Sequence, residues 1–156
     1  MPLIKLNNSS LSAVTSAGIP IRSKSVLQVV SDFTTADINT ASTTFQNSGF
    51  SVSITPTFTT SKVFVIVSVP SWYVAANNAY ATVFRDSTNI GNGDYGLMMV
   101  YNSANYAPST MQVMDAPAST SSLTYSVHHR SPSGDTQYIS HPVYGHLTMT
   151  LMEIAG

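Results

Sequence analysis

Residues 62–69 read KVFVIVSV, and this stretch decides the fold class. In a β-strand its four valines point to one face, while Phe64 and Ile66 point to the other. A strand of an antiparallel sandwich normally shows one face to water and alternates apolar with polar residues. Here both faces are apolar, so we expect another surface to cover the outer one, most simply that of a second subunit. The N-terminal segment or a long loop of the same chain is the alternative cover.

The C-terminal strand repeats this pattern more weakly. Leu147, Met149 and Leu151 share one face of a strand over residues 144–154. Residues at the even positions, which end with Met152 and Ile154, share the other face. The two strands together predict a subunit interface that includes Phe64, Ile66, Met152 and Ile154.

Most of the chain has the period of two that is typical of strands, with Val, Ile, Thr, Tyr and Phe as its main apolar residues. The predicted strands cover residues 25–31, 43–47, 50–55, 62–74, 79–86, 95–101, 110–115, 122–129, 136–140 and 144–154. We expect turns between them, for example at Asn47-Ser48-Gly49 and at Pro108. Short strands at this spacing predict an all-β protein with an antiparallel sandwich at residues 25–156.

Residues 1–24 lack the strand pattern and predict an N-terminal arm. Ser10 is suited to cap a short helical turn that Gly18 and Pro20 would end, and an extended arm is the alternative. The apolar residues Leu3, Ile4 and Leu6 predict an anchor near the tip of the arm, for attachment to a larger partner. A frayed terminus would explain the same segment without any attachment role.

Composition excludes several classes of function. Charged residues make up 8% of the 156 residues and the formal net charge is −1, so we expect no binding to nucleic acid or to an anionic membrane surface. The chain has no cysteine, which excludes disulfides, thiolate metal sites and thiol chemistry. Its first ten residues lack the features of a secretory signal, and its longest apolar run is too short to cross a bilayer. We therefore expect synthesis in the cytoplasm without export, and no membrane association.

Catalytic motifs are missing from the sequence. It contains no GxSxG elbow, Walker loop, HExxH or dinucleotide fingerprint, and its seven acidic residues form no pair with a catalytic spacing. The adjacent His128 and His129 point to opposite faces of a strand, so they cannot share a metal ion without a bulge. Polar outward positions explain all four histidines, although one histidine from each subunit around an axis would also make a metal site. We expect no enzyme, no metal and no cofactor.

The aromatic residues offer a contact surface. They comprise Trp72, Tyr73, Tyr95, Tyr101 and Tyr106. Aromatic rings flanked by Asn and Asp are typical of surfaces that bind carbohydrate or protein, so we predict a ligand or partner contact there. Core packing or subunit packing would explain the same residues without a ligand.

Several runs together resemble a β-sandwich family of virion surface proteins from tailed bacteriophages. The runs are SVLQVV at 25–30, STTF at 42–45, SVSITP at 51–56, TSKVFVIVSV at 60–69, DAPAST at 115–120 with the following LTYSV, and the ending LMEIAG at 151–156. Residues 70–114 match only in outline, through FRDSTNIGNG at 84–93. The resemblance implies a jelly-roll-like sandwich, often trimeric, displayed on the outside of the virion. It implies no catalytic residue.

Two functions follow as expectations. The first is a capsid decoration (cement) protein, a homotrimer that docks on the major capsid protein or another virion protein through the arm and stabilises the shell. The alternative is the tip of a short tail or head fibre that binds a glycan on the host surface. The short segment before the sandwich favours decoration, because a fibre tip normally continues from a shaft or docking domain.

Overall fold

The computed structural model describes residues 24–101 and 106–156. Within these ranges the chain forms eleven β-strands and no helix. The strands are β1 (Val26–Thr34), β2 (Ile38–Thr40), β3 (Gln46–Ile54), β4 (Lys62–Val74), β5 (Asn78–Arg85), β6 (Thr88–Asn89), β7 (Met98–Tyr101), β8 (Ala107–Asp115), β9 (Leu123–Arg130), β10 (Gln137–Ser140) and β11 (Leu147–Ile154). Among the described residues, no helix is long and apolar enough to cross a membrane.

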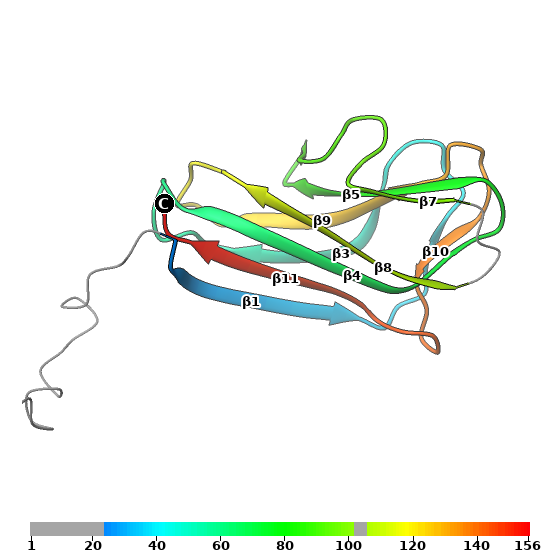
Figure 1. Cartoon of the computed structure of the whole chain (residues 1–156), viewed down its shortest axis with the longest axis horizontal. Coiled ribbons are helices and arrows are strands. Elements are labelled where there is room, and N and C mark those ends of the chain that lie inside the picture. Colours follow the sequence, from blue (N-terminus) through cyan, green and yellow to red (C-terminus); the bar gives the residue numbers. More distant parts are fainter. Residues whose placement is uncertain (1–23, 102–105) are drawn as a thin grey trace, which may run out of the picture.

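The strands form two antiparallel sheets that pack face to face (Figure 1). The first sheet has the order β1-β11-β4-β8, with the short β10 and β2 continuing it beyond the end of β11. The second has the order β3-β9-β5, with β7 and β6 sharing the free edge of β5. The orders β1-β11-β4-β8 and β3-β9-β5-β7, with β7 the short member, follow the jelly-roll arrangement. The expected all-β, jelly-roll-like sandwich is confirmed.

Strand β4 organises the core of the sandwich. It lies between β11 and β8, and its four valines at positions 63, 65, 67 and 69 are fully buried. They pack with buried residues of both sheets, such as Leu151 on β11 and Val127 on β9. The alternation of KVFVIVSV therefore places one face in the core, as the sequence predicts.

A register shift changes which face of β4 points inward. Pairing with β8 slips between Val69 and Trp72, so the odd residues point into the core before the slip and Trp72 and Val74 do so after it. Trp72 is fully buried, and its indole Nε1 donates a hydrogen bond of 3.0 Å to Gln137 Oε1. Tyr73 consequently lies on the outer side of the sheet, where it is half-buried.

Two predicted turns are wrong. Asn47-Ser48-Gly49 lies inside β3 as a bulge opposite β9, where Asn47 Oδ1 accepts a hydrogen bond from the Gly49 backbone and Gly49 takes a φ of 78°. Pro108 lies within β8, at the edge of the first sheet, where a missing backbone donor costs little.

The predicted N-terminal arm at residues 1–24 falls outside the described residues, except for Lys24. The same holds for its attachment residues Leu3, Ile4 and Leu6 and for the turn that Ser10 would cap.

Candidate interaction surfaces

The outer face of the first sheet carries a continuous group of apolar side chains, which we call the outer apolar patch. It consists of Val26, Val29, Phe64, Ile66, Met114, Met152 and Ile154. Strand pairing explains why these residues meet: Val29 pairs with Met152, Met152 with Phe64, and Phe64 with Met114. One row across four strands is therefore entirely apolar.

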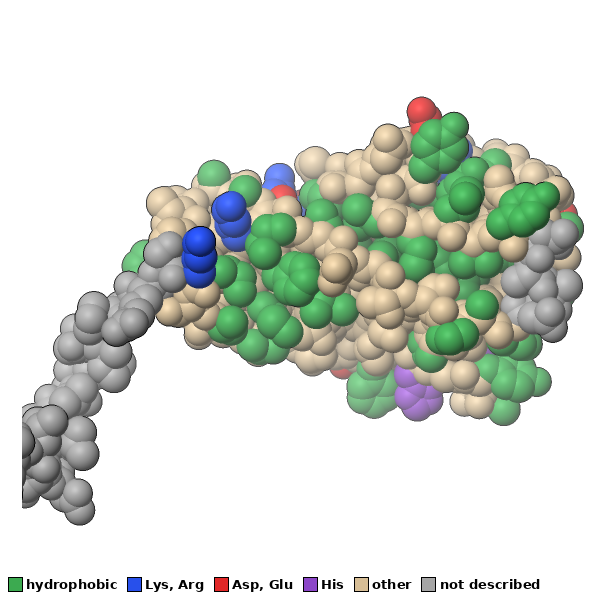
Figure 2. All heavy atoms as spheres, in the orientation of Figure 1, with side chains coloured by type: hydrophobic (Ala, Val, Ile, Leu, Met, Phe, Trp, Pro, Cys, Tyr) green, Lys and Arg blue, Asp and Glu red, His purple; other side chains and the backbone are tan. Residues whose placement is uncertain are grey.

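The predicted interface residues all belong to this patch. Phe64, Ile66, Met152 and Ile154 are half-buried by their neighbours, whereas Val26, Val29 and Met114 are exposed. Covering such a surface would be favourable, because apolar area gains free energy when it leaves water. Figure 2 shows this face, with apolar side chains gathered beside two lysines.

Polar groups border the patch at both ends. Lys24 and Lys62 flank a groove at the end near the C-terminus, lined also by Met114, Ile154, Ala155 and Gly156. Toward the other end the side chains change to Ser and Thr, and Ser31 Oγ lies 2.8 Å from Thr150 Oγ1. The patch is therefore an apolar surface with a polar border, and its residues are neighbours in space and not isolated apolar side chains.

The second sheet presents a different outer face. Its β3 and β9 carry Ser51, Ser53, Thr124 and Ser126 there, and Ser53 Oγ lies 3.0 Å from Thr124 Oγ1. The outer face over β3 and β9 is thus polar, whereas β7 of the same sheet exposes Met99 and Tyr101. The unbroken apolar row across four strands makes the first sheet the stronger candidate for a face that binds a protein surface.

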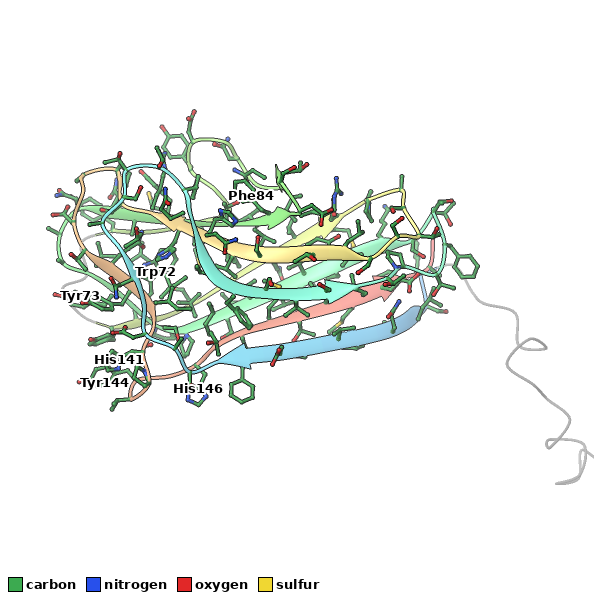
Figure 3. The ribbon with its side chains drawn as sticks, turned by 180° about the vertical axis from the view of Figure 1, so that it is seen from behind. Trp72, Tyr73, Phe84, His141, Tyr144 and His146 are labelled. Carbon is green, nitrogen blue, oxygen red and sulfur yellow. The ribbon has the colours of Figure 1, made fainter. Side chains whose placement is uncertain are left out.

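A cluster of five rings lies at the end of the sandwich away from the C-terminus, and we call it the tyrosine cluster. It consists of Tyr73, Tyr106, Tyr138, Tyr144 and His141. The closest ring centroids are 4.4 Å apart for Tyr106 and Tyr144, and 4.6 Å apart for Tyr144 and His141. Figure 3 shows Tyr73, His141 and Tyr144 at this end, with Trp72 between the two sheets.

Sequence reasoning found only part of this cluster. Tyr73 and Tyr106 do meet, with centroids 5.2 Å apart, because Trp72 pairs with Ala107. Tyr95 packs instead against Tyr80 on the second sheet, and Tyr101 is exposed on β7. The five predicted contact residues therefore do not form one site. Trp72 is wrong as a surface contact, because the register shift of β4 buries it.

Tyr138, Tyr144 and His141 were missed because they lie more than thirty residues along the chain from the other rings. Pairing of β10 with the end of β4 brings Tyr138 opposite Tyr73. The hairpin between β10 and β11, closed by the bridge from His141 to Gly145, then adds His141 and Tyr144. The aromatic residues themselves are the only sequence signal for this site.

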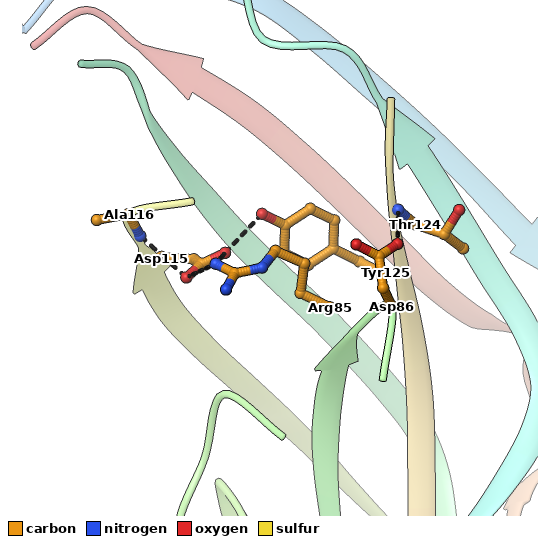
Figure 4. Close-up of polar contacts among 6 residues, drawn as sticks. All are labelled: Arg85, Asp86, Asp115, Ala116, Thr124 and Tyr125. Carbon is orange, nitrogen blue, oxygen red and sulfur yellow. Dashed lines mark hydrogen bonds and ion pairs between the residues drawn. The ribbon is translucent and has the colours of Figure 1, made fainter. Parts of the chain in front are cut away.

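A polar network joins the two sheets near the end of β8 (Figure 4). Asp115 on β8 accepts hydrogen bonds of 2.7 Å from Arg85 on β5 and from the hydroxyl of Tyr125 on β9. Burial, reinforced by the bond to Asp115, raises the pKa of Tyr125 well above its usual range. The charges of Arg85 and Asp115 neutralise each other. Asp115 belongs to the first sheet, whereas Arg85 and Tyr125 belong to the second, so the network holds the two sheets together.

Glu153 is a fully buried carboxylate with four hydrogen-bond donors. Its oxygens accept from Ser61 Oγ at 2.6 Å, Gln28 Nε2 at 2.6 Å, the Thr57 backbone at 2.7 Å and Thr57 Oγ1 at 3.1 Å. Burial alone would raise the pKa of Glu153, but these donors favour the ionised form and lower it. The carboxylate ties β1 and the loop between β3 and β4 to β11.

The histidines occupy different environments. His128 stacks on Phe84 with ring centroids 3.9 Å apart, while His129 is almost fully buried on the core side of β9. The expectation of a polar outward position is therefore wrong for His129, because its side chain lies on the core side of β9. Burial, with a smaller effect of His128, lowers the pKa of His129 to about 4. Within residues 24–101 and 106–156, no three His, Asp or Glu side chains are grouped to hold a metal ion.

His129 predicts acid sensitivity of the fold. In the unfolded chain its imidazole takes up a proton near pH 6.5, whereas in the folded protein it stays neutral down to about pH 4. Stability should therefore fall by about 3 kcal/mol as the pH decreases between these values. We expect His129→Leu to lose most of this slope and to keep only the smaller part that His128 contributes. Urea unfolding at several pH values measures the slope, and equal slopes for the two proteins would contradict the assignment.

Comparison with known proteins gives no relative: no protein-family model matches the chain, and no curated protein matches it.

Proposed function

We propose that this chain is a structural protein of a bacteriophage virion, a homotrimer that decorates the outside of the capsid and stabilises the shell. The observation that carries the proposal is the outer apolar patch. A sandwich whose first sheet carries an apolar row across four strands, while β3 and β9 of its second sheet carry Ser and Thr, suits a protein that works in an assembly, with the apolar row against another copy. The resemblance of the sequence to virion surface proteins supports the same role.

The chemistry of the patch favours another copy of the same chain as its cover. The middle of the patch has no ionised side chain, and Lys24 and Lys62 lie only at its border. A partner needs no opposite charge to match such a surface, and this chain is itself almost uncharged. A trimer would bury the patch at three equivalent contacts and would leave the Ser- and Thr-rich surface of β3 and β9 in water.

The proposed partner of the trimer is the major capsid protein or another virion protein, and the proposed attachment segment includes Leu3, Ile4 and Leu6. Deletion of residues 2–8 is expected to abolish binding to particles while the sandwich stays folded, because the strands of the core begin at Val26. Co-sedimentation of the purified protein with particles that lack it measures the binding. Unchanged binding by the truncated chain would exclude attachment through this segment.

The tip of a short tail or head fibre is the second candidate, and the tyrosine cluster is the observation that favours it. A fibre tip that binds a host-surface glycan would need exposed rings at a free end of the molecule. The number of copies in purified particles separates the two candidates. Decoration predicts a number comparable to that of the major capsid protein, a fibre tip predicts a handful, and complete absence would contradict both.

A further inference from the structure

We propose that the tyrosine cluster is a binding site for a neutral oligosaccharide. The inference does not depend on a role in the virion, since it rests on the geometry of this end of the sandwich. Tyr73 lies nine positions along β4 from Phe64, which is about 30 Å of extended strand. The cluster therefore stays accessible when the outer apolar patch is covered.

The rings form a preorganised platform. Three of them are fixed by strand structure: Tyr73 lies on β4, Tyr138 lies opposite it on β10, and Tyr106 directly precedes β8. Tyr144 and His141 are held by the hairpin before β11. A tyrosine has only two side-chain torsions, so the binding of a ligand to these rings costs little side-chain conformational entropy.

The platform is open to solvent despite its apolar character. Tyr144 is 55% exposed and Tyr106 is 43% exposed. In the part of the chain that the structure describes, none of the four tyrosine hydroxyls has a hydrogen-bond partner. The site thus combines exposed ring faces with hydroxyls that are free to donate and accept.

These features match the chemistry of a sugar ring. A pyranose has patches of C–H groups, which carry a partial positive charge and pack well on the negative face of an aromatic ring. The hydroxyl groups at the edge of the sugar ring would form hydrogen bonds with the tyrosine hydroxyls and with the imidazole of His141.

The arrangement of the rings argues against a cationic ligand. A cage for a quaternary ammonium group surrounds the charge with rings. Here the two most exposed neighbours, Tyr106 and Tyr144, pack directly on each other with ring centroids 4.4 Å apart and an interplanar angle of 38°, and the His141 ring lies 4.6 Å from Tyr144 at 30°. Rings that pack directly on one another leave no central space for a charged group between them. A row of five rings is also larger than one sugar, which is why we infer an oligosaccharide.

The test uses the full chain and an array of neutral oligosaccharides built of glucose, galactose, mannose and N-acetylglucosamine. We expect at least one of them to bind, and Tyr144→Ala to weaken its binding about tenfold or more, because the most exposed tyrosine ring of the cluster is lost. Tyr101→Ala is the control, since Tyr101 is even more exposed than Tyr144 but lies on β7 outside the cluster. It should bind as the wild type does.

A second measurement keeps the test decisive if Tyr144→Ala fails to fold. In the wild-type protein, intermolecular nuclear Overhauser effects should connect protons of the bound sugar with the assigned ring protons of Tyr106 and Tyr144. The proposal is overturned if no oligosaccharide binds, if Tyr144→Ala binds as well as Tyr101→Ala, or if the NMR contacts fall on other rings. Loss of trimer formation or particle docking in Tyr144→Ala, without sugar binding by the wild type, would assign the cluster to a protein partner instead.

Discussion

The variant Phe64→Asp is expected to be a monomer under conditions in which the wild type is a trimer. Phe64 lies in the middle of the apolar row that runs from Val29 to Met114. A carboxylate at this position would be buried without a partner in the trimer, at a cost of at least about 4 kcal/mol, which corresponds to about a thousandfold weaker association. Light scattering coupled to size-exclusion chromatography measures the mass of each species.

Two controls separate loss of assembly from loss of folding. Ser51→Asp introduces the same charge on the outer face of the second sheet, and this variant should remain a trimer. Trp72 is the only tryptophan and is fully buried, so its blue-shifted fluorescence reports an intact sandwich. A folded Phe64→Asp protein that keeps the wild-type mass would show that the patch is not the interface.

Glu153→Ala is expected to have the largest effect on stability. The change leaves the donors of Gln28, Thr57 and Ser61 inside the protein without their acceptor. Because hydrogen bonds to a charged group contribute more than neutral ones, the free energy of unfolding should fall by about 3 kcal/mol or more. Urea unfolding, followed by the fluorescence of Trp72 at fixed protein concentration, measures the loss.

Glu153→Gln and Asp94→Ala are the matched variants for this prediction. Glu153→Gln keeps the size and one acceptor oxygen, so its loss should be intermediate, whereas Asp94→Ala removes an exposed carboxylate and should change little. Since the folded protein lowers the pKa of Glu153 below 4.5, its contribution is present above that pH and is lost as the pH falls through the folded value. Glu153→Gln should lack this loss. A Glu153→Ala protein as stable as the wild type would contradict the account.

These two predictions are linked by the geometry of β11. Glu153 points inward between Met152 and Ile154, which point outward into the patch. The carboxylate therefore fixes the strand that presents part of the proposed interface. We infer that a loosened Glu153 anchor would also weaken assembly, although less than a charge in the patch itself.

Strong alternation made β4 predictable from the sequence, and the strand spans the predicted residues 62–74. The short β2 and β6 were missed, because three and two residues carry no periodicity. Asn47-Ser48-Gly49 has the same chemistry in a turn and in a bulge: a short polar side chain that bonds nearby backbone and a glycine with positive φ. Only the pairing of β3 with β9 distinguishes the two.

The candidate sites were predictable to different degrees. The patch residues on β4 and β11 follow from alternation alone, whereas Val29 and Met114 join them only through strand order. The inward position of Trp72 depends on the slip against β8, which reverses the alternation near the end of β4. Buried polar residues such as Glu153 and His129 give no sequence signal, because their partners come from distant parts of the chain.

The mass of the wild-type protein in solution tests the central claim most directly, which is that the outer apolar patch is an interface between copies of this chain. Native mass spectrometry or light scattering at micromolar concentration should give three times the chain mass of 16.7 kDa. In the same experiment Phe64→Asp should give the mass of a single chain. A folded wild-type protein that stays at 16.7 kDa over this concentration range would contradict the account.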